Sequence, residues 1–157
     1  MKKILLLYAS LTGYTKSIAE ELYTSLKNEY RKYSIDISNI TEINISKLKE
    51  YNSIILGAST WDGNLNPDAD EFFKKFKLDK RNLSGVTFAL FGVGDNSYPD
   101  FCGAIDTIKR LIELYKGSVY GDIPKINSYW DVNITETLRK WVKLFLSENN
   151  NKPKSIT

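Results

Sequence analysis

Short, almost continuously apolar runs alternate along this chain with longer amphipathic segments, and this alternation limits the fold more than any other feature. The apolar runs are residues 4–8, 53–58 and 88–92. Strands that are buried on both faces of a sheet have this composition, because neither face meets water. Residues 34–40 and 118–126 mix polar and apolar positions and are typical of strands near a sheet edge.

Helical periodicity fills the gaps between these runs. Apolar residues recur at steps of three or four within residues 18–30, 67–76, 105–115 and 134–145, and Ile45–Glu50 suggests one helical turn. Five strands that alternate with helices predict an α/β fold in three layers, a doubly wound parallel sheet with helices on both faces. If the second and fifth strands are edges, the order is 2-1-3-4-5. We expect one domain over residues 1–148 and a loose polar tail over 149–157.

The residues that the chain lacks exclude several classes of function. It has 157 residues, no histidine and a single cysteine, Cys102. Imidazole catalysis, histidine-ligated metals, internal disulfides and zinc clusters are therefore excluded, and redox chemistry would require a cofactor. The lysines are scattered rather than arranged in a stripe, which disfavours nucleic acid. No apolar run approaches the length of a membrane span, and the apolar start is short for a signal peptide, so we expect a cytoplasmic protein away from membranes.

Three loops hold the unusual residues. In a sheet of this order, ligands bind beyond the carboxyl ends of the strands where the winding reverses, which places function on the loops after the first, third and fourth strands. The first loop, SLTGYT, leads from a strand into a helix and is typical of an anion site built from amides and hydroxyls. Thr12 as a simple helix cap is the alternative. Tyr14 follows Gly13 where a nucleotide-hydrolysing loop requires lysine, so hydrolysis of ATP or GTP is not expected.

The second and third loops each present an aromatic residue. The second loop, STWDGNLNP, fails as a calcium loop because Pro67 and Phe73 occupy its glycine and glutamate positions; Trp61 is left to stack on a flat ring or to anchor a partner. The third, GVGDNSYPDFC, has Ser97 where a dinucleotide fingerprint requires its third glycine. Cys102 has no histidine base and is not expected to be a nucleophile. A phosphate cradle with Trp61 and Tyr98 on separate loops suits a flat heteroaromatic ring that bears one phosphate.

These three loops together resemble the flavodoxins. The phosphate motif [ST]-x-T-G-x-T is Ser10 to Thr15, the second motif matches at residues 59–61, and G-x-G-D-x-x-Y-x-x-F-C-x-A-x-D is present at every fixed position from Gly92 to Asp106. The similarity extends over about residues 3–146, and the length is that of the short-chain group.

The resemblance implies a flavodoxin-like fold and non-covalent FMN. The residues it places at the cofactor are Ser10, Leu11, Thr12, Gly13, Tyr14, Thr15, Ser59, Thr60, Trp61, Asp62, Gly63, Gly94, Asp95, Tyr98, Phe101 and Cys102. In this family the hydroxyls and amides of the first loop bind the phosphate, the two aromatics cover the ring, and backbone groups at Asp95 and Cys102 bind its pyrimidine edge. No catalytic residue and no metal are implied.

The function that the resemblance implies is low-potential, one-electron transfer between redox enzymes by a monomer. Its partners would be flavin reductases and ferredoxin-type donors or acceptors. An FMN reductase on the same fold is the competing interpretation, but stacking by both Trp61 and Tyr98 would obstruct hydride transfer to the ring. A protein dedicated to activating one enzyme, such as a ribonucleotide reductase, is the third.

Two features depart from the family. The peptide that rotates to stabilise the one-electron-reduced flavin should be Asp62–Gly63, where many relatives have Gly-Asp; aspartate adopts positive φ at a cost, so we expect weaker stabilisation. Flavodoxins are usually acidic, whereas this chain has a formal net charge of +3. Residues 59–71 and 92–108 nevertheless sum to −7, so the rest carries +10, which predicts an acidic rim on a basic body. The carboxylates of this rim are Asp62, Asp68, Asp70, Glu71, Asp95, Asp100 and Asp106.

Overall fold

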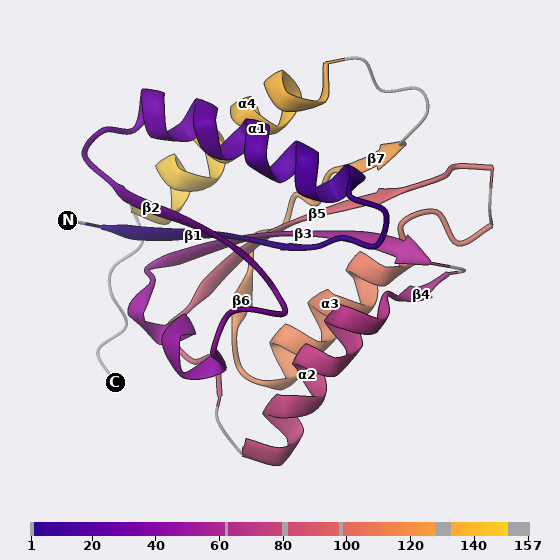
Figure 1. The fold of residues 1–157 in the computed structure, drawn as a ribbon. Coiled ribbons are helices and arrows are strands. Elements are labelled where there is room, and N and C mark those ends of the chain that lie inside the picture. The colour runs from indigo at the N-terminus through magenta and orange to yellow at the C-terminus, as the bar shows by residue number, and fades with distance from the viewer. Residues whose placement is uncertain (1, 62, 80–81, 98, 128–132, 151–157) are drawn as a thin grey trace.

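The computed structural model describes residues 2–61, 63–79, 82–97, 99–127 and 133–150, without the side chains of Trp61, Asp79 and Asn150. Its centre is a parallel sheet of β1 (Lys3–Ala9), β2 (Ser34–Asn39), β3 (Ser53–Trp61) and β5 (Thr87–Gly94), with β6 (Ser118–Val119) and β7 (Lys125–Asn127) both paired to β5. The strand order is β2-β1-β3-β5-β6, which confirms the predicted order 2-1-3-4-5 and the α/β fold class (Figure 1).

The predicted fifth strand is divided in two. Residues 118–126 form no continuous ladder: β6 ends at Val119 and β7 begins at Lys125. The Tyr120 amide still donates to the Phe88 carbonyl at 2.8 Å, and the Pro124 carbonyl accepts from the Gly92 amide at 2.9 Å. Proline has no N–H to donate in return, so the ladder breaks before it.

The structure also contains a short strand that the periodicity did not predict. β4 (Asn64–Leu65) pairs antiparallel with the end of β3, Thr60 opposite Leu65 and Trp61 opposite Asn64. The chain after β3 therefore folds back on that strand before it enters α2.

Helices cover both faces of the sheet. α1 (Tyr14–Glu29) and α4 (Ile134–Asn150) lie on one face, and α2 (Pro67–Asp79), α3 (Gly103–Leu114) and the 3₁₀ helix η1 (Ile45–Glu50) lie on the other (Figure 1). α4 ends at Asn150, two residues past the domain boundary expected at residue 148. Within its last turn, the Asn149 side-chain amide donates to the Ser53 hydroxyl at 2.7 Å. No helix in these described ranges is long and apolar enough to cross a membrane.

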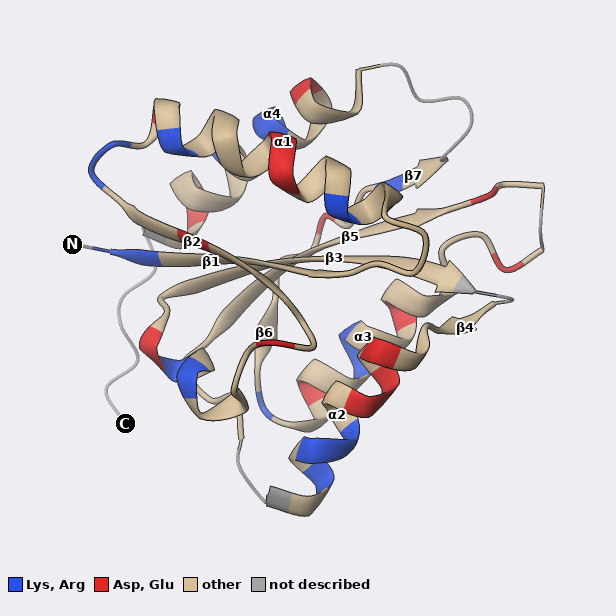
Figure 2. Cartoon of the chain, viewed as in Figure 1, with Lys and Arg blue, Asp and Glu red and all other residues tan. Residues whose placement is uncertain are grey.

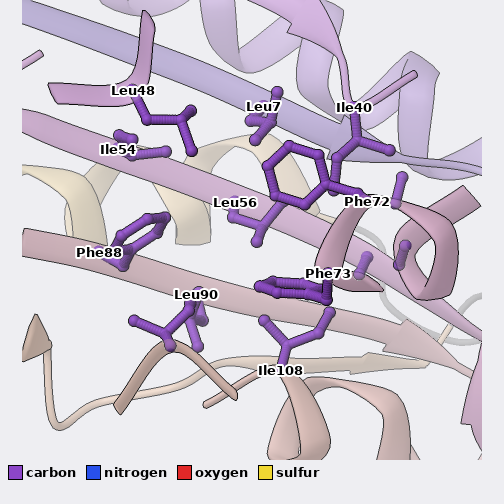
Figure 3. Close-up of a cluster of buried hydrophobic side chains, with 14 of the residues drawn as sticks. Leu7, Ile40, Leu48, Ile54, Leu56, Phe72, Phe73, Phe88, Leu90 and Ile108 are labelled. Carbon is purple, nitrogen blue, oxygen red and sulfur yellow. The ribbon is translucent and has the colours of Figure 1, made fainter. Parts of the chain in front are cut away.

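The core has two parts because successive residues of a strand point to opposite faces. Figure 3 shows the part under α2 and α3, where Leu56 and Leu90 from the sheet meet Phe72, Phe73 and Ile108 from the helices. The part under α1 and α4 gathers the alternate strand positions with the apolar faces of those two helices. Its members from the strands include Ile4, Leu6, Ile55, Ala89 and Phe91.

A glycine in β3 makes room for one of these side chains. A Cβ at Gly57 would lie 2.1 Å from Cζ of Phe91, whose ring is fully buried and lies edge-on to Trp141 with the ring centroids 6.2 Å apart. The ring thus occupies the space above residue 57, and only glycine fits there.

Candidate functional site

The ends of β1, β3 and β5 meet at one edge of the sheet, and the three loops singled out from the sequence leave from it (Figure 1). The chain runs from β1 into α1 on one face, and from the neighbouring β3 into α2 on the opposite face. This is the point where the winding reverses, where open α/β sheets bind their ligands.

The first loop is arranged as an anion site. Gly13 has φ of +90° and is the N-cap of α1, with its amide donating to the Ser10 hydroxyl at 3.1 Å. No side chain caps the helix, so the alternative role of Thr12 as the cap is wrong, and no acidic residue occupies the first turn. The positive end of the helix dipole is therefore left for an anion. Leu11 is exposed, while Tyr14 packs against the core under α1 and α4.

Lys16 faces away from this anion site. Its ammonium lies 3.9 Å from the Glu20 carboxylate, one turn farther along α1, and half of its side chain is exposed. An anion bound here would therefore be held by amides and hydroxyls.

Thr15 carries the most informative atom of the first loop. Its side chain is only 1% exposed, and its Oγ1 has no hydrogen-bond partner among the residues that the structure describes. A buried hydroxyl without a partner costs about 1–3 kcal/mol. An anion oxygen at the start of α1 would give this hydroxyl its missing acceptor.

The second loop lies directly against the third. The Thr60 hydroxyl accepts from the Ala104 amide at 3.1 Å, in the first turn of α3. A Cβ at Gly103 would lie 3.1 Å from the Gly63 carbonyl, and a Cβ at Gly63 would lie 2.9 Å from Oδ2 of Asp100. Gly63 has φ of +75°, so the turn is adopted by glycine at low cost. Ser59 is half-buried at the end of β3; Asp62 and the Trp61 side chain lie outside the described residues.

The third loop brings its backbone close to α3. A Cβ at Gly94 would lie 3.2 Å from both the amide nitrogen and Sγ of Cys102, so glycine permits the close approach. Cys102 is fully buried at the N-cap of α3 with φ of +56°, and its thiol donates to the Ile126 carbonyl at 3.9 Å. This cysteine is placed to shape the backbone, as expected for a residue that is not a nucleophile. Phe101 packs against the core beneath, and Tyr98 falls outside the described ranges.

Asp95 is held by a local turn. Its Oδ1 accepts from the Ser97 hydroxyl at 2.6 Å and from the Ser97 amide at 2.9 Å. These hydrogen bonds favour the carboxylate and hold the pKa of Asp95 below its usual range. The carboxylate is thus tied to its own loop, which leaves the backbone of residue 95 to face a ligand.

Asn66 was missed as a site residue by the sequence analysis. It is fully buried, and its Oδ1 accepts from the Ala69 amide at 3.0 Å, which caps α2. An asparagine directly before Pro67 at the start of a helix is an N-cap signature, and that signal was available in the sequence. Its side-chain amide also contacts Ala9 and Ser59. The sequence carries no signal for these contacts, because they join residues that are separated in the chain.

The predicted acidic rim is weaker than the sequence sum of −7. Asp70 pairs with Lys74 at 2.9 Å on α2, and Asp106 pairs with Lys125 of β7 at 2.9 Å. Both lysines lie outside the segments that were summed, so at most five carboxylates keep an uncompensated charge. Figure 2 shows the remaining acidic positions along the third loop and the first half of α2, and the basic ones at the far end of α2.

Comparisons with known proteins agree with this geometry. A family model described as Flavodoxin matches residues 6–141. A flavodoxin of Maridesulfovibrio salexigens is 32% identical over 129 residues, which cover 81% of this chain and 87% of the relative. The Bacillus subtilis protein named probable flavodoxin 1 is 35% identical over 129 residues, covering 80% of this chain and 78% of the relative. The crystal structure of oxidised Flavodoxin 2 from Bacillus cereus is 29% identical, with a TM-score of 0.78 over 93% of this chain and 99% of that one.

Proposed function

The chain belongs to the flavodoxin family, and from this premise we propose which of its residues hold the FMN with which it transfers electrons. The protein is an FMN-dependent electron carrier rather than an enzyme with a substrate of its own. FMN supplies the redox chemistry when it is bound. The protein's residues bind, orient and shield it.

The observation that carries the proposal is the buried hydroxyl of Thr15, which has no hydrogen-bond partner within the described part of the chain. It stands at the uncapped start of α1 beside Gly13. We assign the FMN phosphate to this position, with donors from the hydroxyls of Ser10, Thr12 and Thr15 and from the amides of residues 11–15. A monophosphate that is held and never transferred requires neither a lysine nor a metal.

The flavin ring belongs between the second and third loops. Trp61 and Tyr98 would cover its two faces, and Ser59, Thr60 and Gly63 would line the phosphate side and the N5 edge. Backbone groups of Gly94, Asp95 and Cys102, with Phe101 beneath them, would bind the pyrimidine edge. Two close approaches support this assignment, that of Gly63 to Asp100 and that of Gly94 to Cys102. They bring the backbone of the second loop and that of the third loop together at one edge of the sheet. The loops would exclude water from the ring and fix its hydrogen bonds.

Partner recognition would rest on the carboxylates around the flavin. Flavodoxins pass electrons to and from redox partners; for this chain we propose flavin reductases and ferredoxin-type proteins that present a basic surface. Carboxylates such as Asp68 and Asp100, which form no ion pair among the described residues, would steer such partners. Basic side chains beyond about 8 Å would be screened at physiological salt. We propose that the carrier works as a monomer in the cytoplasm.

Purified protein tests the carrier role. We expect it to bind one FMN, to take up electrons singly in an anaerobic titration followed by absorbance, and to leave NADPH unoxidised unless a reductase is added. Rapid oxidation of NADPH by the protein alone would contradict the carrier and support an FMN reductase.

Steering by the rim is tested by the rate of reduction by a flavin reductase. Asp68→Asn with Asp100→Asn should slow association severalfold at low salt and much less at high salt. Glu113→Gln is the control, since this carboxylate lies about 15 Å from the start of α3 and is paired with Lys109 at 3.8 Å rather than belonging to the rim. A rate that is equally insensitive to salt in all forms would refute steering.

A further inference from the structure

Asn66 connects two of the loops that we assign to FMN. Its Nδ2 donates to the Ala9 carbonyl at 3.1 Å and to the Ser59 hydroxyl at 3.1 Å, with the Ser59 carbonyl at 3.5 Å. Ala9 is the last residue of β1, and Ser59 directly precedes Thr60 near the end of β3. One side-chain amide therefore spans the junction of the phosphate loop and the second loop.

The backbone cannot make this connection by itself. Regular pairing between β1 and β3 ends at Ala9 opposite Ala58, and Ser59 pairs instead with Val93 of β5. The two chains separate here toward opposite faces of the sheet. The amide of Asn66 links them where the ladder ends, and its Oδ1 fixes the same side chain to the first turn of α2.

We propose that Asn66 is a positioning residue for the FMN site, whose side-chain NH₂ sets the spacing between the phosphate loop and the second loop. The proposal rests on the assignment of FMN to these loops. Because its amide is bonded to Ala9 and Ser59 and its Oδ1 to the Ala69 amide, Asn66 acts through these residues rather than by touching the cofactor. A purely structural residue would change stability alone, whereas a positioning residue changes the affinity for FMN.

Replacement by aspartate separates the two roles of this side chain. Asn66→Asp keeps the oxygen that caps α2, and asparagine and aspartate are equally good caps. It replaces the NH₂ donor by a second oxygen, which would face the Ala9 carbonyl and the Ser59 hydroxyl. If Asn66 is only a cap, this variant binds riboflavin, which has no phosphate for the new carboxylate to repel, as tightly as the wild type does.

The test is a fluorescence titration of FMN and of riboflavin with each apoprotein, alongside urea unfolding. We expect Asn66→Asp to weaken FMN binding about tenfold or more, since the Ala9 carbonyl keeps only the longer bond from the Ser59 hydroxyl, at 3.5 Å. Asn149→Ala is the matched control: it removes a similar amide-to-hydroxyl bond at the opposite end of β3 and should leave FMN affinity unchanged. Equal affinity of Asn66→Asp and wild type for either flavin overturns the inference. Failure of the wild type to bind FMN would instead overturn the site assignment.

A measurement on the wild type keeps the proposal testable if Asn66→Asp does not fold. The side-chain amide hydrogens of Asn66 should exchange with deuterium at least about tenfold more slowly than those of the exposed Asn28. The reason is that the NH₂ of Asn66 donates to two acceptors within the fold. Equal exchange rates would show that the bridge is not maintained in solution and would refute the positioning role.

Discussion

Replacing Thr15 by valine should stabilise the apoprotein and weaken its hold on FMN. Valine has the shape of threonine without the hydroxyl, and both are β-branched, so the start of α1 should be little disturbed. The hydroxyl of Thr15 is buried, and no described residue forms a hydrogen bond with it. Removing it relieves a cost in the apoprotein and removes a donor from the complex, so the two effects have opposite signs.

The magnitudes follow from these contacts. A buried hydroxyl without a partner costs about 1–3 kcal/mol. The free energy of unfolding of apo-Thr15→Val should therefore exceed that of the wild-type apoprotein by up to this amount. A hydrogen bond to a charged group contributes about 1.5–3 kcal/mol, so loss of the donor to the phosphate should raise the Kd for FMN by about 10- to 150-fold.

Urea unfolding of the apoprotein and fluorescence titration of FMN measure the two effects separately. Thr24→Val is the matched control on the same helix, because its hydroxyl is exposed and bonded to the Glu20 carbonyl at 3.1 Å. It should change neither quantity appreciably. A less stable apo-Thr15→Val, or one with an unchanged Kd for FMN, would refute the view that this hydroxyl waits for the phosphate.

Three further predictions concern the core, a tyrosine and the flavin loop. Gly57→Ala should lower the free energy of unfolding by about 1–3 kcal/mol or more in urea, because its Cβ would meet the buried ring of Phe91; a neutral result would show that the ring relaxes freely. Burial and a 2.8 Å hydrogen bond to Asp36 raise the pKa of Tyr51 from 10.0 to about 12, so the stability it contributes should be lost as pH rises through that window. Tyr51→Phe should lack this share of the alkaline decline, and identical pH profiles would contradict the assignment. Asp62→Gly should shift each of the two one-electron potentials by roughly 40–80 mV in opposite directions, the equivalent of 1–2 kcal/mol of backbone strain. Potentials unchanged in an anaerobic redox titration would refute that reasoning.

The sequence predicted well where the three loops lie, because their place depends on local patterns. Apolar runs identified the three inner strands, and the mixed runs identified the edges, which together set the winding order. That order placed the loops after β1, β3 and β5 at one edge. Glycines at 13 and 63 signalled turns that the structure realises with positive φ.

What the sequence could not predict depends on contacts between distant residues. Residues 64–65 are too short for a periodic signal, and they form β4 only because the end of β3 lies beside them. Summing charges over segments overestimated the rim, since Lys125 reaches Asp106 from a different strand. The amide of Asn66 likewise finds its acceptors 57 and 7 residues away in the chain.

In the apoprotein, several energetically unfavourable features lie at the site. Cys102 has positive φ there, which costs a cysteine roughly 1–2 kcal/mol, whereas Gly13 and Gly63 adopt positive φ at low cost. The Thr15 hydroxyl adds a similar cost. Bound FMN would offset the cost of the Thr15 hydroxyl directly. It would also use the strained backbone of Cys102, which would meet the pyrimidine edge of the ring. The cofactor would therefore stabilise the fold as well as occupy the site. Its affinity must then appear in the stability: free FMN at 1,000 times its Kd adds about 4.1 kcal/mol to the free energy of unfolding, and substitutions at these loops should lower that gain without changing the core.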